Sequence, residues 1–141
     1  MAWHRASRAS QRLTSIPGIG PITASAIAAA VPEATLFRSG RQFAAWLGLT
    51  PRPHSSGGKQ RLGGISKQGD SYIRRLLVTG ATAVIRFARQ DNASKSWAAE
   101  PLRRKPARVV SVALANKTAR IAWAILARKQ SYTAPATAPA V

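Results

Sequence analysis

The sequence contains no cysteine, which excludes disulfide bonds and thiolate metal sites. Acidic residues are almost as scarce, with 4 Asp and Glu side chains among 141 residues. Enzymes that hold two catalytic metal ions use several carboxylates in one place, whereas these four lie in separate parts of the chain: Glu33, Asp70, Asp91 and Glu100. We therefore expect no metal site and no cofactor in this chain.

Long apolar runs are also missing. No stretch reaches the ~18 apolar residues that a membrane-spanning helix needs, and the opening MAWHRASRASQR is basic with no hydrophobic stretch behind it. The positive charge is spread along the chain and is not gathered on one amphipathic segment. The sequence predicts no membrane partner, and a cytoplasmic location associated with the bacterial nucleoid.

Positive charge is abundant. The 22 Lys and Arg residues give a formal net charge of +18. Self-repulsion on that scale is relieved by an anionic partner, and the phosphate backbone of DNA or RNA is the usual one. Hydrophobic residues form 45% of the chain, which is enough for a folded core.

Apolar residues recur at helical spacing, and no convincing strand pattern is present, so the predicted fold class is all-α. Helices are expected over about 3–14, 21–30, 39–47, 71–89 and 106–129. Asp70 is the expected N-cap of the fourth, and Trp46 and Trp123 are expected to pack in the core. We expect one domain over 1–130, a polar connection over 91–105 around Trp97, and a disordered tail over 131–141.

The segment around IPGIGP has the pattern of a helix-hairpin-helix over about 12–31. Gly18 and Gly20 allow a tight turn, and the amide groups that open the second helix can hold a phosphate oxygen without reading a base. The alternative is a tight turn between two helices that binds no ligand.

The stretch from 48 to 69 is rich in glycine and is expected to be a long basic loop. It contains two serines before a Gly-Gly pair, and a serine hydroxyl among so many cations is suited to bind or attack a phosphate. The alternative is a solvated basic linker, because no base for the serine is obvious and His54 is as readily a phosphate contact or a bystander. The surrounding cations are Arg52, Lys59, Arg61, Lys67, Arg74 and Arg75.

Four blocks in order resemble the C-terminal domain of the insertion-sequence transposases of the IS110 family, and more closely its IS1111 branch. The blocks are SIPGIGPITASAIAAAV, FRSGRQFAAWLGLTPRPHSSGGKQRLGGISKQGDSYIRRLLV, GATAVIR and RKPARVVSVALANKTARIAWAILAR. Together they span residues 15–128.

The resemblance implies DNA transposition, a recombination reaction in which this helical domain supplies a serine that attacks the DNA backbone. The family serine falls on Ser56, with Ser55 as the alternative, and the neighbouring cations would hold the phosphates. The resemblance also implies an N-terminal acidic domain that binds divalent metal (Mg), a homo-oligomer and a guide RNA encoded by the element. That acidic domain is absent here, so we expect a truncated copy that is inactive alone.

Three functions follow as hypotheses. The first is the serine-bearing part of a transposase. The second is a non-catalytic, sequence-independent DNA- or RNA-binding module, and the third is a ribosome-like RNA-binding protein, in which the SSGG stretch would have no role.

Overall fold

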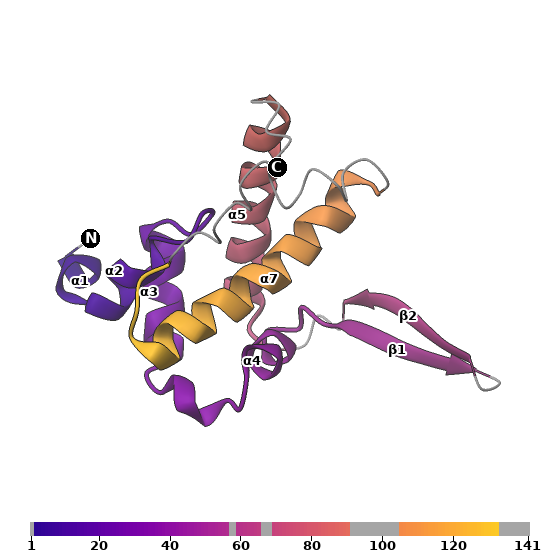
Figure 1. Ribbon diagram of the computed structural model, residues 1–141, viewed down its shortest axis with the longest axis horizontal. Helices are drawn as coiled ribbons and strands as arrows, with labels where there is room; N and C mark the ends of the chain where they lie inside the picture. Colours follow the sequence, from indigo (N-terminus) through magenta and orange to yellow (C-terminus); the bar gives the residue numbers. More distant parts are fainter. Residues whose placement is uncertain (1, 57–58, 66–68, 91–104, 133–141) are drawn as a thin grey trace, which may run out of the picture.

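The computed structural model describes residues 2–56, 59–65, 69–90 and 105–132, and shows a helical body with one projecting β-hairpin (Figure 1). In chain order the elements are α1 (Ala2–Ala6), α2 (Arg8–Leu13), α3 (Pro21–Ala30), a 3-10 helix η1 (Ala34–Leu36), α4 (Gly40–Trp46), β1 (Pro51–Ser56), β2 (Lys59–Ile65), α5 (Ser71–Gln90) and α7 (Ala107–Arg128).

The all-α class is confirmed for the body, and four helices begin close to where their sequence signals place them. Pro21 opens α3, since proline lacks the N–H that a first helical turn leaves unpaired anyway. The hydroxyl of Ser39 accepts a hydrogen bond from the Gln42 N–H at 3.2 Å and caps α4. The carboxylate of Asp70 accepts from the Ile73 N–H at 2.9 Å, so the predicted cap of α5 is confirmed.

The single helix expected over 3–14 is replaced by two short ones. Ser7 adopts an extended conformation (φ −101°, ψ 113°) that interrupts the first helix, and its hydroxyl accepts from the Ser10 N–H to start the second. Serine competes for backbone hydrogen bonds in this way, which favours helix ends over helix interiors.

The prediction of a long loop over 48–69 is wrong for the larger part of this stretch. Residues 51–56 and 59–65 form an antiparallel pair with a register shift between Pro51 and Pro53. The glycine and proline content suggested a loop, but a two-residue Gly-Gly link between paired segments is also a hairpin signal. Positions 57–58 and 66–68 lie outside the described residues, as do most of the connection around Trp97 and the tail from 133 onward.

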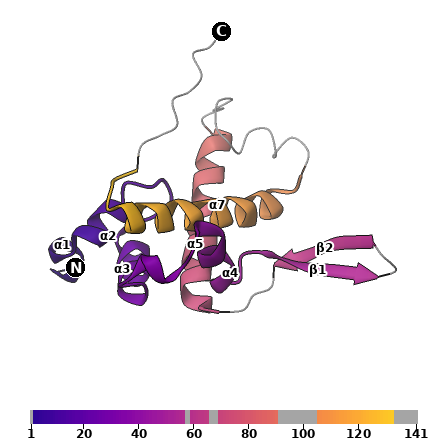
Figure 2. The same cartoon turned by 60° about the horizontal axis from the view of Figure 1, so that its bottom comes forward.

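Helix α7 crosses the body and lies against α2, α4 and α5 (Figures 1 and 2). Its buried face is built largely from small side chains, so neighbouring helices approach closely: Val110, Ser111, Ala115, Thr118, Ala119, Ala122 and Ile125. By length and composition alone, α7 is the one helix among the described residues that could cross a membrane. In this structure that apolar character serves the core, which α7 shares with Phe43, Ile73 and Leu77.

The two tryptophans differ in burial. Trp123 is partly buried and its indole N–H donates to the Ala34 carbonyl at 2.9 Å, in agreement with the predicted packing role. Trp46 stacks on Phe43 with ring centroids 6.0 Å apart but is 40% exposed, so it lies at the edge of the core.

Candidate nucleic-acid interface

The β-hairpin extends away from the helical body, and Figures 1 and 2 show both of its strands running outward from the helices. Its entry is fixed at Leu49, whose N–H donates to the Ala44 carbonyl at 3.0 Å. The Leu49 carbonyl accepts from the side-chain amide of Asn116 on α7 at 3.0 Å. The first strand therefore leaves the body from a residue held by two different helices.

The exit of the hairpin is fixed just as closely. Gly69 has φ +86°, and a Cβ on it would lie 1.6 Å from the Trp46 carbonyl oxygen. Four residues after the cap residue Asp70, Arg74 donates from Nη1 to the Leu47 carbonyl at 3.2 Å. Leu49 before the hairpin and Gly69 after it thus both lie against α4.

The register places the predicted residues along this projection. Ser56 lies opposite Lys59, Ser55 opposite Gln60 and His54 opposite Arg61. Arg52 lies in β1, within the register shift between Pro51 and Pro53. Lys67 lies outside the described residues. The serine pair and three of the predicted cations therefore share one two-stranded element.

Arg74 and Arg75 lie at the base of the hairpin, in the first turns of α5. Arg74 is partly buried and holds the Leu47 carbonyl, so it has a structural task in addition to the predicted contact with phosphate. Arg75 is exposed and directs its charge to solvent.

The turn between α2 and α3 separates the two glycines that the sequence grouped together. Gly18 has φ +91° and packs on α5, where a Cβ would lie 3.1 Å from Val84 Cγ2. Gly20 is the N-cap of α3, has no side-chain cap, and a Cβ on it would meet nothing within 4 Å. Gly18 therefore fixes the turn to the body, while Gly20 leaves the start of α3 open to solvent.

The described residues do not fit a metal centre. Of the four acids, Glu33 and Asp70 are described, and Asp70 already accepts the capping hydrogen bond of α5. Within the described ranges, no three His, Asp or Glu side chains come together. The divalent metal that the resemblance implies has no suitable donor set in this part of the chain.

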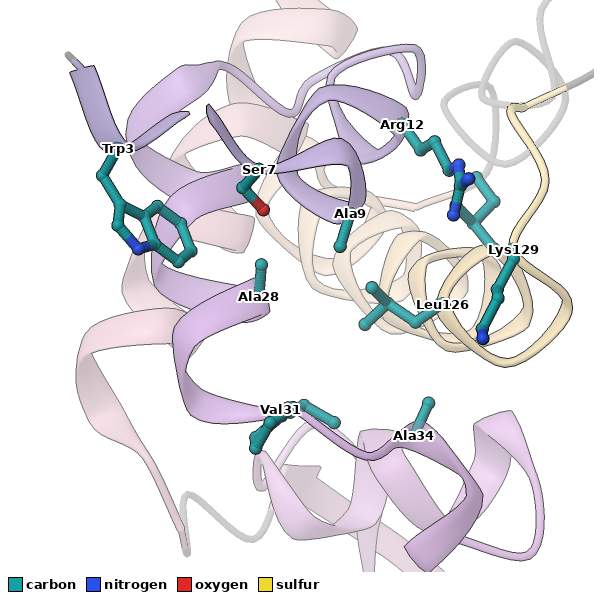
Figure 3. A pocket seen from close by; sticks show the side chains of 11 residues that line it. Trp3, Ser7, Ala9, Arg12, Ala28, Val31, Ala34, Leu126 and Lys129 are labelled. Carbon is teal, nitrogen blue, oxygen red and sulfur yellow. The ribbon is translucent and has the colours of Figure 1, made fainter. Parts of the chain in front are cut away.

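A pocket of about 230 Å³ lies between α2, α3 and the end of α7, away from the hairpin (Figure 3). Its walls are mainly apolar, with Ala28, Val31 and Leu126 among them, and Arg12 and Lys129 lie together at one side. Ser7 is the lining hydroxyl, and it already caps α2. No sequence pattern indicates this pocket, because its residues come from three separate segments.

Sequence reasoning also missed a cluster of cations where α4 meets α7. Arg41 and Arg120 are exposed, and Lys117 is partly buried beside them. Burial lowers the pKa of the Lys117 ammonium, and the neighbouring Arg120 guanidinium lowers it further. Lys117 and Arg120 lie three residues apart on α7, whereas Arg41 is far away in the sequence and approaches them only through the packing of α4 on α7.

Comparison with known proteins identifies the family. Residues 10–97 match the model of the transposase IS116/IS110/IS902 family. The chain belongs to this family. It is 59% identical over 123 residues to a probable family 20 transposase of Pseudomonas aeruginosa, covering 86% of this chain and 36% of that protein.

Two further relatives are transposases of named insertion sequences. The chain is 43% identical over 129 residues to the IS1111A transposase of Coxiella burnetii, covering 91% of this chain and 35% of the relative. It is 47% identical over 116 residues to the IS1328 transposase of Yersinia enterocolitica, covering 82% and 35%. The chain thus spans about a third of the length of these relatives.

Proposed function

We propose that this chain is the DNA-binding, serine-bearing part of an insertion-sequence transposase, and that its β-hairpin presents Ser56 to a DNA phosphodiester during strand cleavage and transfer. The observation that carries the proposal is the hairpin itself. It holds the serine pair, projects from the helical body, and pairs Ser56 with Lys59 in the register.

The chemistry uses few groups. The Ser56 hydroxyl loses its proton to a base and attacks phosphorus, so that an Oγ–P bond forms while the bond to one deoxyribose oxygen breaks. The released sugar oxygen takes up a proton. Attack by a second strand's hydroxyl then breaks the Oγ–P bond and frees the serine. Cations on the hairpin and its base, Lys59, Arg61 and Arg75 among them, would stabilise the charge that develops on the phosphoryl oxygens.

The turn before α3 provides a second contact with DNA. The first N–H groups of α3 have no side-chain cap, and Gly20 leaves the approach to them open. Such amides, together with the helix dipole, hold phosphate oxygens without reading sequence. In this role the helix-hairpin-helix positions the duplex, and Gly20, not Gly18, is the glycine that a phosphate approaches.

The partners and the location are part of the same proposal. Acting with the remaining two-thirds of a family-length protein, the chain would work as a homo-oligomer on DNA in the bacterial cytoplasm, at the nucleoid. An RNA encoded by the element would guide it, and Mg²⁺ would be held outside the residues described here.

The test uses a full-length relative and the positions aligned with the two serines. We expect Ser56→Ala to abolish a covalent protein–DNA adduct, measured with end-labelled DNA under denaturing conditions, while binding to DNA persists. Ser55→Ala should keep the adduct, and it is the matched control because it lies one residue away on the same strand. The proposal for Ser56 is wrong if the adduct survives Ser56→Ala and is lost in Ser55→Ala.

The second candidate is a non-catalytic module that binds nucleic acid without sequence preference. The scarcity of carboxylates favours this candidate, since the described residues lack a donor set for the metal that the chemistry would need. For this chain it predicts duplex binding that weakens steeply with salt. It also predicts that the wild-type protein, from which the two serine variants derive, forms no covalent adduct with DNA. Affinity that stayed constant between low and high salt would exclude both candidates.

A further inference from the structure

Helix α7 meets the segment before the hairpin at three points, which we call the α4–α7 seam. The Asn116 side chain donates to the Leu49 carbonyl, and the Trp123 indole donates to the Ala34 carbonyl. Between them, a Cβ on Gly40 would lie 3.0 Å from the Cα of Arg120, so the two backbones nearly touch.

The spacing of these contacts gives the seam a direction. Asn116, Arg120 and Trp123 are four and three residues apart, which places them on one face of a helix. They meet Leu49, Gly40 and Ala34, so the earlier segment runs antiparallel to α7. Arg120 lies one turn of α7, about 6 Å, from the residue that holds the root of the hairpin.

Cations lie along this seam from both elements. Arg41 follows Gly40 directly, and Arg38 precedes it by two residues; both side chains are exposed. From α7, Arg120 is exposed, and Lys117 is close enough for Arg120 to lower its pKa. The acids in the described residues are Glu33 and Asp70, and Asp70 is engaged in capping α5. The seam therefore carries a concentrated positive charge beside the hairpin root.

We propose that the α4–α7 seam is a second DNA-binding surface, on which Arg41, Lys117 and Arg120 hold the sugar-phosphate backbone flanking the stretch engaged by the hairpin. The inference rests on the proposed function, since it extends the same bound duplex. One strand places a phosphate about every 3.4 Å along the axis, so a duplex at the root reaches Arg120 within two phosphates. The planar guanidinium fork pairs well with phosphate oxygens.

The test compares two double variants that lose the same charge. Arg41→Gln with Arg120→Gln removes two exposed cations of the seam. Arg86→Gln with Arg128→Gln removes two exposed cations away from it, on the second half of α5 and the last turn of α7. Fluorescence anisotropy with a labelled duplex at a series of salt concentrations gives the slope of log Kobs against log salt for each protein. Circular dichroism melting of each variant verifies that it is folded.

We expect the seam variant to show a slope shallower than wild type by roughly 1.8, because each lost phosphate contact removes ~0.9. The control variant should keep nearly the wild-type slope. If the wild-type chain binds with a steep slope and both double variants keep it, or both lose it equally, the seam proposal is overturned and the proposed function stands. A wild-type chain that shows no salt-dependent binding overturns the proposed function, and the seam proposal with it.

Discussion

The carbonyl oxygen of Gly18 occupies the space that a side chain on Gly80 would need. A Cβ on Gly80 would lie 2.1 Å from that oxygen, far inside van der Waals contact. The turn before α3 therefore packs backbone to backbone on α5. Because α5 also begins at the exit of the hairpin, this contact links the turn and the hairpin to one helix.

Gly80→Ala should destabilise the domain. Helix propensity alone would favour alanine inside α5 by about 1 kcal/mol, but overpacking against a backbone costs about 1–3 kcal/mol or more. Chemical denaturation should show a lower free energy of unfolding for the variant. Gly20→Ala is the matched control, with an expected loss under about 1 kcal/mol, since a Cβ there meets nothing within 4 Å. Equal losses in the two variants would contradict the packing role of this contact.

The helices were predictable because their signals are local. Asp70 caps the turn that follows it, Pro21 opens α3, and apolar spacing marks the buried faces of α5 and α7. The hairpin was missed because its strands contain prolines and glycines and lack alternating apolar residues, so only the pairing between strands reveals it. The different roles of Gly18 and Gly20 were also hidden, since Gly18 packs on Gly80 and Val84 of α5, some sixty positions later in the chain, and Gly20 does not.

Asn116→Ala should loosen the root of the hairpin. The variant loses the hydrogen bond to the Leu49 carbonyl and leaves that carbonyl, on a buried residue, without the amide donor. The expected cost is about 1–3 kcal/mol in the free energy of unfolding. Hydrogen exchange should also become faster at Leu49 than in wild type, while exchange within α3 stays unchanged.

The control for this substitution is Gln130→Ala, which removes an exposed amide after the end of the same helix. Its expected effect is within about 0.5 kcal/mol. Exchange that accelerated uniformly across the domain in Asn116→Ala would show a global loss of stability and contradict a local role at the hairpin root.

Asp70→Ala should cost about 0.5–2 kcal/mol, because the first turn of α5 loses the oxygen that accepts from the Ile73 N–H. Asp70→Asn keeps a side-chain oxygen at the cap and should recover most of that loss. Thermal melts of the three proteins measure the effect. If asparagine were as damaging as alanine, the negative charge of Asp70 near the basic hairpin base, and not the capping hydrogen bond, would be the main contribution.

Lys117→Met should stabilise the domain at neutral pH. Burial first, and Arg120 second, lower the pKa of Lys117 in the folded state below its ordinary value of 10.5. Between the two values the unfolded chain binds the proton more readily, so the stability of the wild type rises as the pH increases towards 10.5. Methionine has a similar volume and no charge, so the variant does not carry the cost of burying the Lys117 ammonium. The gain in Tm of the variant over wild type should therefore be largest near neutral pH and shrink as the pH rises through that window.

Lys105→Met, at an exposed position just before α7, is the control and should give no such trend. If the gain in Tm stayed constant with pH, the stabilisation would come from packing alone, and the lowered pKa of Lys117 would have no part in it. Duplex DNA should oppose the gain, because a phosphate on the α4–α7 seam stabilises the charged ammonium, so the wild type should gain more Tm from added DNA than the variant does.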